Sequence, residues 1–426
     1  MAMFHGGGNV YLILPIVRAL TARGHRVRVL VGPRIWMPEP PPPAELLAAV
    51  AAAGATVIPL PQPVHNPHHV APARRGLFMG WTPRQLSRGR NLATASWWAQ
   101  TWAEATAREI LRERPDILAA DYFLLGAMAA GEAAGISTAV LVHNAMHPAP
   151  VPGLPPPGSG FAPARSAIGH LRDGIFATAL HRVVARDALP SLNRARSALG
   201  LAELDSAFDQ YERTACLLIL SSAAFDFKTD RLPKNVRYAG VTFDEAPSTP
   251  WQSPWPADDR RPLVLVSLST LDQGQGPVLR NVLEAVSRLP VRALVTLGPA
   301  MATGDFRAPL NAKLEVFTPH TSVLPHTAAV ISQCGLSTVT KALSFGVPLV
   351  CLPILADQPD NAARIVAAGA GIRLRADATP EQIAAATARI LADERFRGAA
   401  RRLQALLNLE HGADTAADEL ELLATA

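Results

Sequence analysis

Short runs of β-branched and aliphatic residues, each followed by a loop and an amphipathic helix, recur along the whole chain of 426 residues. The first unit has a glycine loop at Gly6-Gly7-Gly8, a helix over 10–23 with one apolar face, and a strand over 27–31. Parallel strands need helical crossovers of this kind. Further strands are predicted over 117–120, 138–142, 216–220, 263–267, 293–296, 314–317, 330–332 and 349–352. This rhythm predicts an α/β protein built on parallel sheets.

A break in the rhythm predicts two domains. Residues 242–261 are rich in Pro, Ser, Asp and Trp and lack apolar periodicity, as expected of a linker. We therefore expect one Rossmann-like, doubly wound domain over 1–241 and a second, with terminal helices, over 262–426. The first strand of such a sheet is normally central, yet only residues 1–4 are available for it. Either that strand is short or the true start of the chain lies upstream.

Composition excludes several classes of protein. With 49% apolar and 18% charged residues, the chain is expected to be globular. A net charge of +5 without a basic stripe argues against a nucleic-acid partner. No apolar run reaches the ~18 residues of a membrane span, and no secretion signal is seen, so a cytoplasmic location is expected. Cys216, Cys334 and Cys351 show no CxxC spacing, which argues against disulfides and a metal site.

The residues from Ser332 to Thr338 form the strongest local motif. They lie between a predicted buried strand and a predicted helix over 339–345. Small residues in such a turn leave backbone N–H groups free to converge, and the helix start adds partial positive charge, which suits a phosphate or diphosphate. The alternative is an ordinary tight turn in which Ser337 is the helix N-cap.

A second motif, Leu355-Ala356-Asp357-Gln358-Pro359-Asp360-Asn361, follows the next predicted strand and opens another helix. A carboxylate beside an amide offers several hydrogen bonds in one plane, which sugar hydroxyls require. The alternative is an Asp N-cap followed by Pro near the first helical position.

Taken together, these motifs resemble the donor-binding region of the UDP-glycosyltransferase superfamily, in particular of bacterial enzymes that decorate natural products. The resemblance is strongest over 316–364 and weaker at Gly6-Gly7-Gly8, Ala120-Asp121 and 266–270. It implies the GT-B fold, in which two Rossmann-like domains face each other across a cleft. The matching residues are Pro319, Val323-Leu324-Pro325-His326, Gly335, Thr338, Ala342-Leu343, Gly346-Val347-Pro348-Leu349, Pro353, Asp357-Gln358 and Asn361-Ala362.

The resemblance implies inverting transfer of a sugar from a UDP- or dTDP-sugar to a small aromatic or polyketide-like acceptor, with no further cofactor. A homodimer is compatible with the sequence. The resemblance implies that Asp357 and Gln358 hold the sugar. The nucleobase would lie against the backbone near Gly298 and His320. The diphosphate would lie between two turns, formed by Ser269 and Thr270 on one side and by Gln333, Cys334, Gly335, Ser337 and Thr338 on the other.

Three positions depart from the family pattern. Gln333 replaces a usual His and keeps an N–H donor but loses the option of positive charge. Lys341 replaces a Glu that would accept hydrogen bonds from ribose hydroxyls; since lysine has no acceptor, dTDP becomes more plausible than UDP. Asn9 stands where the family has the histidine that acts as general base, and an amide cannot take up a proton near pH 7.

The identity of the base therefore has several candidates. Asp121 matches the aspartate that normally holds the histidine, and it could deprotonate the acceptor directly. His5, just before the glycine loop, or His143, at the end of the strand over 138–142, could replace the missing histidine. An acidic or carbon-nucleophilic acceptor would need little help. We expect Asp121 to be essential, because it lies at the carboxyl edge of its sheet.

The sequence offers few candidate residues for binding the sugar acceptor. His65 and Trp81 are the acceptor-binding candidates, although a solvated loop explains His65 and core packing explains the tryptophans. A nicotinamide enzyme is excluded because Gly6-Gly7-Gly8-Asn9 lacks the G-x-G-x-x-G spacing. The serious rival is a non-catalytic relative that binds a sugar nucleotide or assists a partner enzyme.

Overall fold

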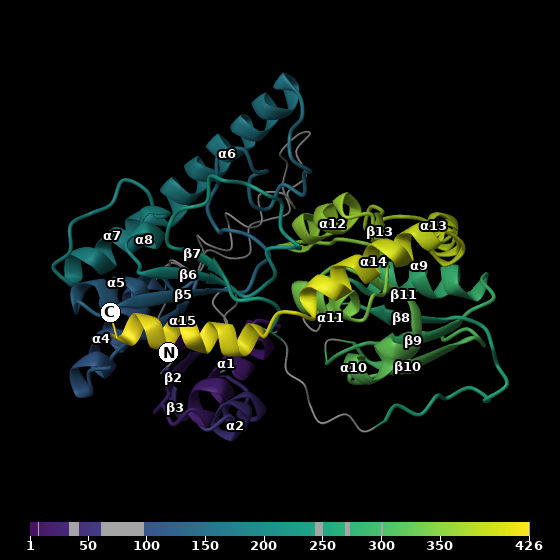
Figure 1. Cartoon of the computed structure of the whole chain (residues 1–426), viewed down its shortest axis with the longest axis horizontal. Helices are drawn as coiled ribbons and strands as arrows, with labels where there is room; N and C mark the ends of the chain where they lie inside the picture. The colour runs from purple at the N-terminus through teal and green to yellow at the C-terminus, as the bar shows by residue number, and fades with distance from the viewer. Residues whose placement is uncertain are drawn as a thin grey trace.

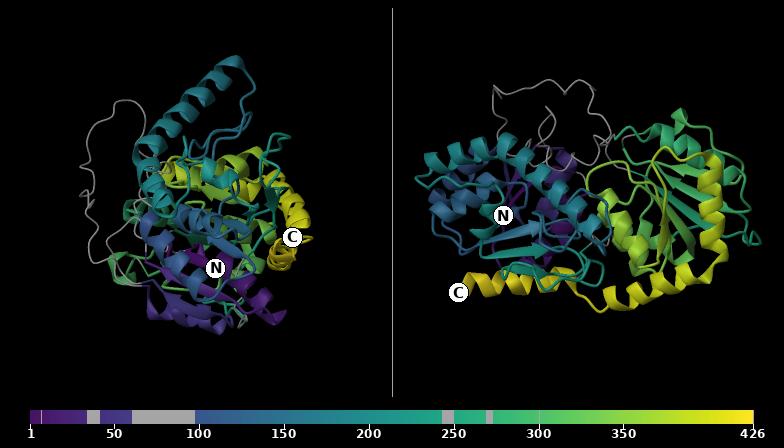
Figure 2. Two further views of the ribbon diagram at one scale, coloured as in Figure 1. Left: turned by 90° about the vertical axis from the view of Figure 1, so that its left-hand side faces the viewer. Right: turned by 90° about the horizontal axis from the view of Figure 1, so that it is seen from above.

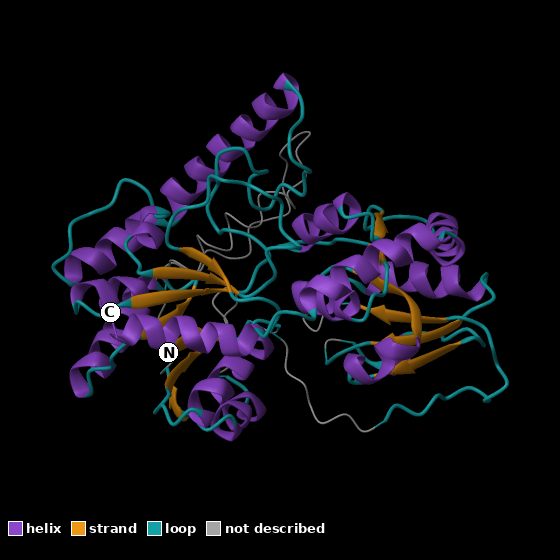
Figure 3. Ribbon diagram, viewed as in Figure 1, coloured by secondary structure: helices purple, strands orange, loops and turns teal. Residues whose placement is uncertain are grey.

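The computed structural model describes residues 1–6, 8–33, 42–60, 98–242, 250–268, 273–299 and 301–425. Two sheets, one in each half of the chain, lie side by side, and helices cover their faces (Figure 1, Figure 3). The first sheet has the strand order β3 (Thr56–Pro59), β2 (Arg28–Gly32), β1 (Ala2–Phe4), β4 (Leu118–Asp121), β5 (Thr138–Val142), β6 (Cys216–Ile219) and β7 (Val236–Tyr238). The second has the order β10 (Ala312–Glu315), β9 (Arg292–Thr296), β8 (Leu263–Ser267), β11 (Thr327–Ser332), β12 (Leu349–Cys351) and β13 (Gly371–Arg373).

Both sheets are doubly wound, as the sequence predicts. Their described strand pairs are all parallel, and in each sheet the chain runs outward from the first strand in one direction and then crosses to build the other side. The order therefore reverses between β1 and β4 and again between β8 and β11. Ligands of open α/β sheets bind outside the carboxyl ends of the strands at such reversals.

The helices alternate with the strands in each half. In the first half they are α1 (Val10–Ala22), α2 (Ala44–Ala52), α4 (Ala99–Arg112), α5 (Leu125–Ala133), α6 (Ala167–Asp187), α7 (Leu189–Ala198) and α8 (Asp209–Glu212). In the second half they are α9 (Gly276–Ser287), α10 (His320–Val323), α11 (Leu336–Ser344), α12 (Gln358–Ala367), α13 (Pro380–Ala392), α14 (Glu394–Leu407) and α15 (Gly412–Thr425). Within these described segments, no helix is long and apolar enough to cross a membrane.

Helix α1 shows how the local sequence sets the fold. Leu12, Ile13, Ile16 and Val17 recur at helical spacing and are buried against the first sheet. Each such side chain contributes about 1.5–3 kcal/mol through its burial. The helix ends where Gly24 adopts a φ of 88° and donates its N–H to the carbonyl of Thr21.

Several element bounds differ from the sequence prediction. Helix α11 begins at Leu336, three residues earlier than predicted, so that Gly335 and not Ser337 is its N-cap. The predicted strand over 314–317 ends at Glu315, since Phe317 is 76% exposed beyond the sheet. The edge strands β3, β7 and β13 were not predicted, because their own three or four residues carry too short an apolar pattern.

The last helix returns to the first sheet. Figure 2 shows α14 and α15 along one side of the molecule, and α15 packs on α1. Ala416, Ala417 and Leu420 of α15 belong to a buried cluster shared with α1. At the end of α1, Arg23 forms ion pairs with Asp414, Asp418 and Glu421.

A buried ion pair joins the two halves. Arg364 of α12 donates from Nε (2.9 Å) and Nη2 (2.5 Å) to Oδ1 of Asp226, and both side chains are at most 3% exposed. The hydroxyl of Tyr238 donates to Oδ2 of Asp226 at 2.6 Å. Burial, with this carboxylate beside the phenol, raises the pKa of Tyr238. Removing one member of such a pair is costly because it leaves the other charge buried alone.

Candidate functional site

The first sheet brings three sequence candidates together at its carboxyl edge. Asn9 follows β1, Asp121 ends β4, and His143 follows β5. Because β4 pairs with both β1 and β5, the ends of these three strands are neighbours. The group therefore lies at the reversal of strand order.

Asp121 is the centre of this group. Its side chain is fully buried, and its Oδ1 accepts a hydrogen bond from the backbone N–H of Phe123 at 3.1 Å. Its Oδ2 accepts a hydrogen bond from Nδ2 of Asn9 at 3.2 Å. The Nε2 atom of His143 lies 3.1 Å from the same Oδ2, and the His143 side chain is 13% exposed. Solvent can reach the imidazole but not the carboxylate.

The side chain of Asn9 links the glycine loop to the ends of β1 and β4. Its Nδ2 also donates to the carbonyl of Phe4 at 3.1 Å, and its Oδ1 accepts the N–H of Gly6 at 3.0 Å. All three bonds lie in a nearly closed environment, since Asn9 is 4% exposed. The residue that occupies the family's histidine position thus supports Asp121 and the loop. His5 lies on the same edge, with its N–H bonded to the carbonyl of Gly32.

Aromatic rings surround the imidazole of His143. Its ring centroid lies 4.8 Å from that of Tyr122, 6.0 Å from that of Phe123 and 6.3 Å from that of Phe4. These rings restrict the rotation of the imidazole. The local sequence after β4, Tyr122-Phe123, therefore orients a side chain that follows β5.

The second sheet has its own turn at the reversal of strand order, between β11 and α11. Cys334 is buried and adopts a φ of 72°, a left-handed conformation that costs a residue with a side chain about 1 kcal/mol. Its N–H donates to Oγ of Ser332, and its carbonyl accepts from Nδ2 of Asn361 at 2.9 Å. Burial, with the neighbouring thiol of Cys351, raises the pKa of the Cys334 thiol. The thiol therefore stays protonated near pH 7, and Cys334 shapes the turn through its backbone.

The start of α11 suits an anion. No side chain caps the helix, so its first N–H groups have no capping partner, and Ser337 and Thr338 lie half-exposed in its first turn. Gln333 is 6% exposed, and its Oε1 has no hydrogen-bond partner among the described residues. The N–H groups at the uncapped helix start can donate to a phosphate oxygen, whereas Oε1 of Gln333 is an acceptor and needs a donor such as a hydroxyl group.

The loop after β12 is held by its own side chains. Oε1 of Gln358 accepts the N–H groups of Ile354 and Leu355 at 2.8 and 2.9 Å, and its Nε2 donates to Gln273 at 2.8 Å. Asp357 occupies the N-cap position of α12 but makes no cap hydrogen bond. Its Oδ2 instead accepts from Nδ2 of Asn361 at 2.7 Å. Gln358 therefore shapes the loop, and Asp357 is its half-exposed carboxylate.

The residues predicted to bind the nucleobase lie near the ends of β9 and β10. Nε2 of His320 lies 3.0 Å from Oγ1 of Thr296. Burial, with a smaller effect from the positive charge of Lys341, lowers the pKa of His320 to about 4. His320 is therefore neutral near pH 7. Gly298 has a φ of 67° and donates its N–H to the carbonyl of Val316.

Comparisons with known proteins show which proteins this chain is similar to. Residues 280–416 match the family model of the C-terminal domain of erythromycin biosynthesis protein CIII-like proteins. The 4'-demethylrebeccamycin synthase of Lentzea aerocolonigenes is 29% identical over 68% of this chain and 69% of its own length. The demethyllactenocin mycarosyltransferase of Streptomyces fradiae is 33% identical over 45% of this chain and 44% of its own. The chain thus spans under half of the second relative.

Solved structures support the fold along the entire chain. The crystal structure of a calicheamicin glycosyltransferase matches with a TM-score of 0.71 at 22% identity, covering 100% of this chain and 98% of that one. The glycosyltransferase VinC, solved with dTDP, matches with a TM-score of 0.66 at 19% identity over 100% of both chains. These matches support the UDP-glycosyltransferase superfamily for this chain. The chain is a nucleotide-sugar-dependent glycosyltransferase with the GT-B fold.

Some candidate residues of this glycosyltransferase lie outside the described ranges, namely Ser269, Thr270, His65 and Trp81. Of the other tryptophans, Trp102 is buried in the core and Trp98 packs against the same cluster, as the core-packing interpretation predicts. No group of three or more His, Cys, Asp or Glu side chains that could hold a metal ion occurs in the part of the chain that the structure describes.

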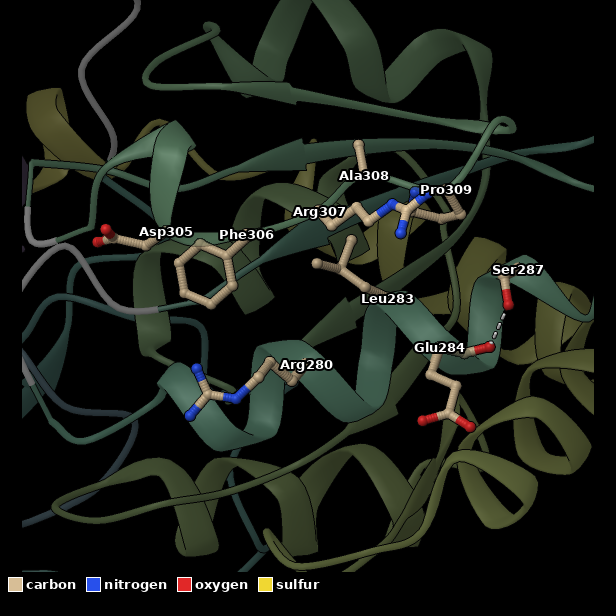
Figure 4. Close-up of a pocket in the computed structure, with 9 residues that line it drawn as sticks. All are labelled: Arg280, Leu283, Glu284, Ser287, Asp305, Phe306, Arg307, Ala308 and Pro309. Atoms are coloured by element: carbon tan, nitrogen blue, oxygen red, sulfur yellow. Dashed lines mark hydrogen bonds between the residues drawn. The ribbon is translucent and has the colours of Figure 1, made fainter.

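Two surface hollows of the glycosyltransferase contain none of the candidate residues. One, of about 360 Å³, lies between α9 and residues 305–309 and is lined by Arg280, Phe306 and Arg307 among others (Figure 4). The second, of about 300 Å³, lies at the amino edge of the first sheet beside Arg28 and Leu118. The candidate site is instead defined by residues at the carboxyl edges of the two sheets.

Sequence reasoning missed the residues that link the two halves of this glycosyltransferase. Asp226 and Arg364 carry no local pattern, because they meet only in the folded chain. Asp360 lies inside the quoted donor motif, but nothing distinguished it there. The glycines at 158 and 160 inside a proline-rich loop were the available signal of a close backbone contact.

Proposed function

We propose that this enzyme transfers a sugar, with inversion at the anomeric carbon, from a dTDP- or UDP-sugar to a hydroxyl group of a small aromatic or polyketide-like acceptor. The proposal rests on the pairing of His143 with Asp121 at the carboxyl edge of the first sheet. This pair supplies the proton acceptor whose absence at Asn9 would otherwise argue for a non-catalytic protein.

We assign the general base to His143 and an orienting role to Asp121. Asp121 has no exposed surface and already accepts hydrogen bonds from Asn9 and Phe123, so it is badly placed to reach an acceptor. His143 is the more exposed of the two and lies 3.1 Å from the carboxylate. A carboxylate so close stabilises the imidazolium that forms when the ring takes a proton.

The transfer step follows from this assignment. The acceptor oxygen forms a bond to the anomeric carbon of the sugar while the bond from that carbon to the diphosphate oxygen breaks. The nucleoside diphosphate leaves with the electron pair, and the acceptor proton passes to His143. The leaving diphosphate would be stabilised by the N–H groups at the start of α11 and by the amide N–H of Gln333.

For the donor nucleotide we propose dTDP before UDP. Lys341 replaces the carboxylate that would accept ribose hydroxyls, and deoxyribose offers one hydroxyl fewer. Two structural neighbours of the same fold, VinC and a spinosyn rhamnosyltransferase, were solved with thymidine diphosphate. Their fold similarity makes the same class of ligand the first to try here.

Calorimetric titration with dTDP and UDP, followed by mass spectrometry of a turnover mixture, tests the proposal. We expect dTDP to bind at least as well as UDP, and a dTDP-sugar to give a product heavier than the acceptor by one sugar. Nucleotide binding without turnover on any acceptor would favour the non-catalytic alternative, which the glycosyltransferase relatives do not favour.

A further inference from the structure

The segment that follows His143 runs from the first half of the molecule to the second. Residues 144–149 and 154–160 of this loop are buried although they form no helix or strand. Irregular segments usually lie on the surface, because their backbone polar groups need partners. This loop finds partners on α12, the helix that opens with the predicted sugar-binding residues Asp357 and Gln358.

Asp360 makes the principal contact. Its Oδ2 accepts the backbone N–H of Gly158 at 2.7 Å, and its Oδ1 accepts that of Gly160 at 2.8 Å. Asp360 is 2% exposed, so both oxygens act in a dry environment. Each oxygen of the carboxylate accepts one of the two backbone donors, and such charge-assisted bonds are about twice as strong as neutral ones.

Other contacts hold the same loop against the second half. Nη1 of Arg373 donates to the carbonyl of Gly160 at 2.6 Å. Near the start of the loop, Nη2 of Arg364 lies 3.3 Å from the sulfur of Met146. Gly160 fits closely, since a Cβ atom added there would lie 2.6 Å from Cβ of Pro359. The loop is therefore held both close to His143 and at its far end.

We propose that Asp360 is a positioning residue for sugar transfer. It fixes the loop that begins at His143 to the helix that begins at the sugar-binding Asp357, and so sets the distance between the base and the anomeric carbon. This inference rests on the proposed function. Asp360 itself touches neither substrate, because both of its oxygens are bound to the glycine backbone.

The contact of Asp360 affects the distance between the general base and the sugar because of where its residues lie. Asp360 is three residues from Asp357 along α12, whereas Gly158 belongs to the loop that starts beside the base. Loss of the contact lets the loop shift relative to the start of α12 without altering the turn that holds the diphosphate. A displacement of about 1 Å between reacting groups lowers a rate by as much as about 100-fold.

The test compares Asp360→Asn with the wild type and with the control Asp377→Asn, which changes an exposed carboxylate of the same half. Asparagine keeps the shape but presents an NH₂ group to one of the two glycine N–H donors. The dissociation constant of dTDP is measured by calorimetry. Rates are measured with dTDP-glucose and benzyl alcohol, an acceptor that is not acidic and therefore depends on the base, and hydrolysis of dTDP-glucose is measured alongside transfer.

We expect Asp360→Asn to bind dTDP within about twofold of the wild type and to keep its KM for dTDP-glucose, while kcat for transfer falls about 10- to 100-fold. Hydrolysis should fall less than transfer, because water needs no positioning by the loop. Gly160→Ala disturbs the same contact from the other side and should give the same pattern; it decides the matter if Asp360→Asn does not fold.

Unchanged transfer, or dTDP binding that weakens in proportion to transfer, would overturn the positioning role. The wild type separates this failure from that of the proposed function. A wild-type protein that binds no nucleotide contradicts the proposed function itself, and the inference falls with it.

Discussion

The Nε2 atom of His143 lies 3.1 Å from the Oδ2 atom of Asp121, at the ends of two paired strands. This contact puts an imidazole beside the aspartate that the family uses to hold a histidine, but the imidazole comes from a different strand. The histidine position of the family, at Asn9, is used for hydrogen bonding instead.

Asp121→Asn should lower turnover at least about 100-fold, the low end of general-base assistance. The amide keeps the size of the side chain but loses the charge that stabilises the protonated ring of His143. The affinity for dTDP should stay nearly unchanged, because the donor turn lies on the other sheet. Steady-state kinetics and calorimetry measure the two effects, and a full rate with Asp121→Asn would remove Asp121 from the mechanism.

Asp357→Ala should weaken binding of an intact dTDP-sugar much more than binding of dTDP alone, by about 1–3 kcal/mol. Its carboxylate is half-exposed, whereas the amide of Gln358 is occupied by the loop. Calorimetry with dTDP-glucose and dTDP on the same variant makes the comparison internal. Equal weakening of both ligands would show that Asp357 does not hold the sugar.

Lys341→Glu should shift the preference of the enzyme from dTDP toward UDP. The new carboxylate can accept hydrogen bonds from both ribose hydroxyls, which lysine cannot do. The ratio of the two dissociation constants is the measurement. A wild-type enzyme that clearly prefers UDP would contradict the argument from Lys341.

The lowered pKa of His320 predicts that the stability of the folded protein depends on pH. This pKa is about 4 in the folded chain and about 6.5 when unfolded, so between these values the unfolded chain binds more protons. The stability that comes from the neutral ring is therefore present above about pH 6.5 and is lost as the pH falls toward 4. Over that window the loss should be about 1–3 kcal/mol.

His320→Gln removes this titration and places an amide where the imidazole lies near Thr296. Urea unfolding at pH 7 and at pH 4.5 should show a smaller loss of stability for the variant than for the wild type. Equal losses for the two proteins would mean that the burial of His320 does not govern this pH dependence.

Much of the fold could be predicted from the sequence because its central strands are buried on both faces. The runs over 138–142 and 263–267 are continuous in apolar and β-branched residues, and the structure has strands at these bounds. The short edge strand β13 was missed since Gly371-Ile372-Arg373 contains one large apolar residue.

The candidate site was predictable only where one stretch of sequence builds it. The turn after β11 was located correctly, because a buried strand, small residues and a helix follow one another there. The sequence left Asp121, His5 and His143 open as the base, and the difference in burial on which we base the proposal of His143 depends on neighbouring strands. The contact of Asp360 with Gly158 and Gly160 joins segments from different halves of the chain, so its only local signal was the pair of glycines in a proline-rich loop.

The rate of His143→Ala with two acceptors tests the central claim most directly. One acceptor is an unactivated alcohol and the other is 4-nitrophenol, whose hydroxyl is acidic enough to need little help from a base. With dTDP-glucose as donor, the variant should lose about 10²- to 10⁴-fold on the alcohol and much less on the phenol. An equal loss on both acceptors, or no loss on the alcohol, would contradict the assignment of His143 as the general base.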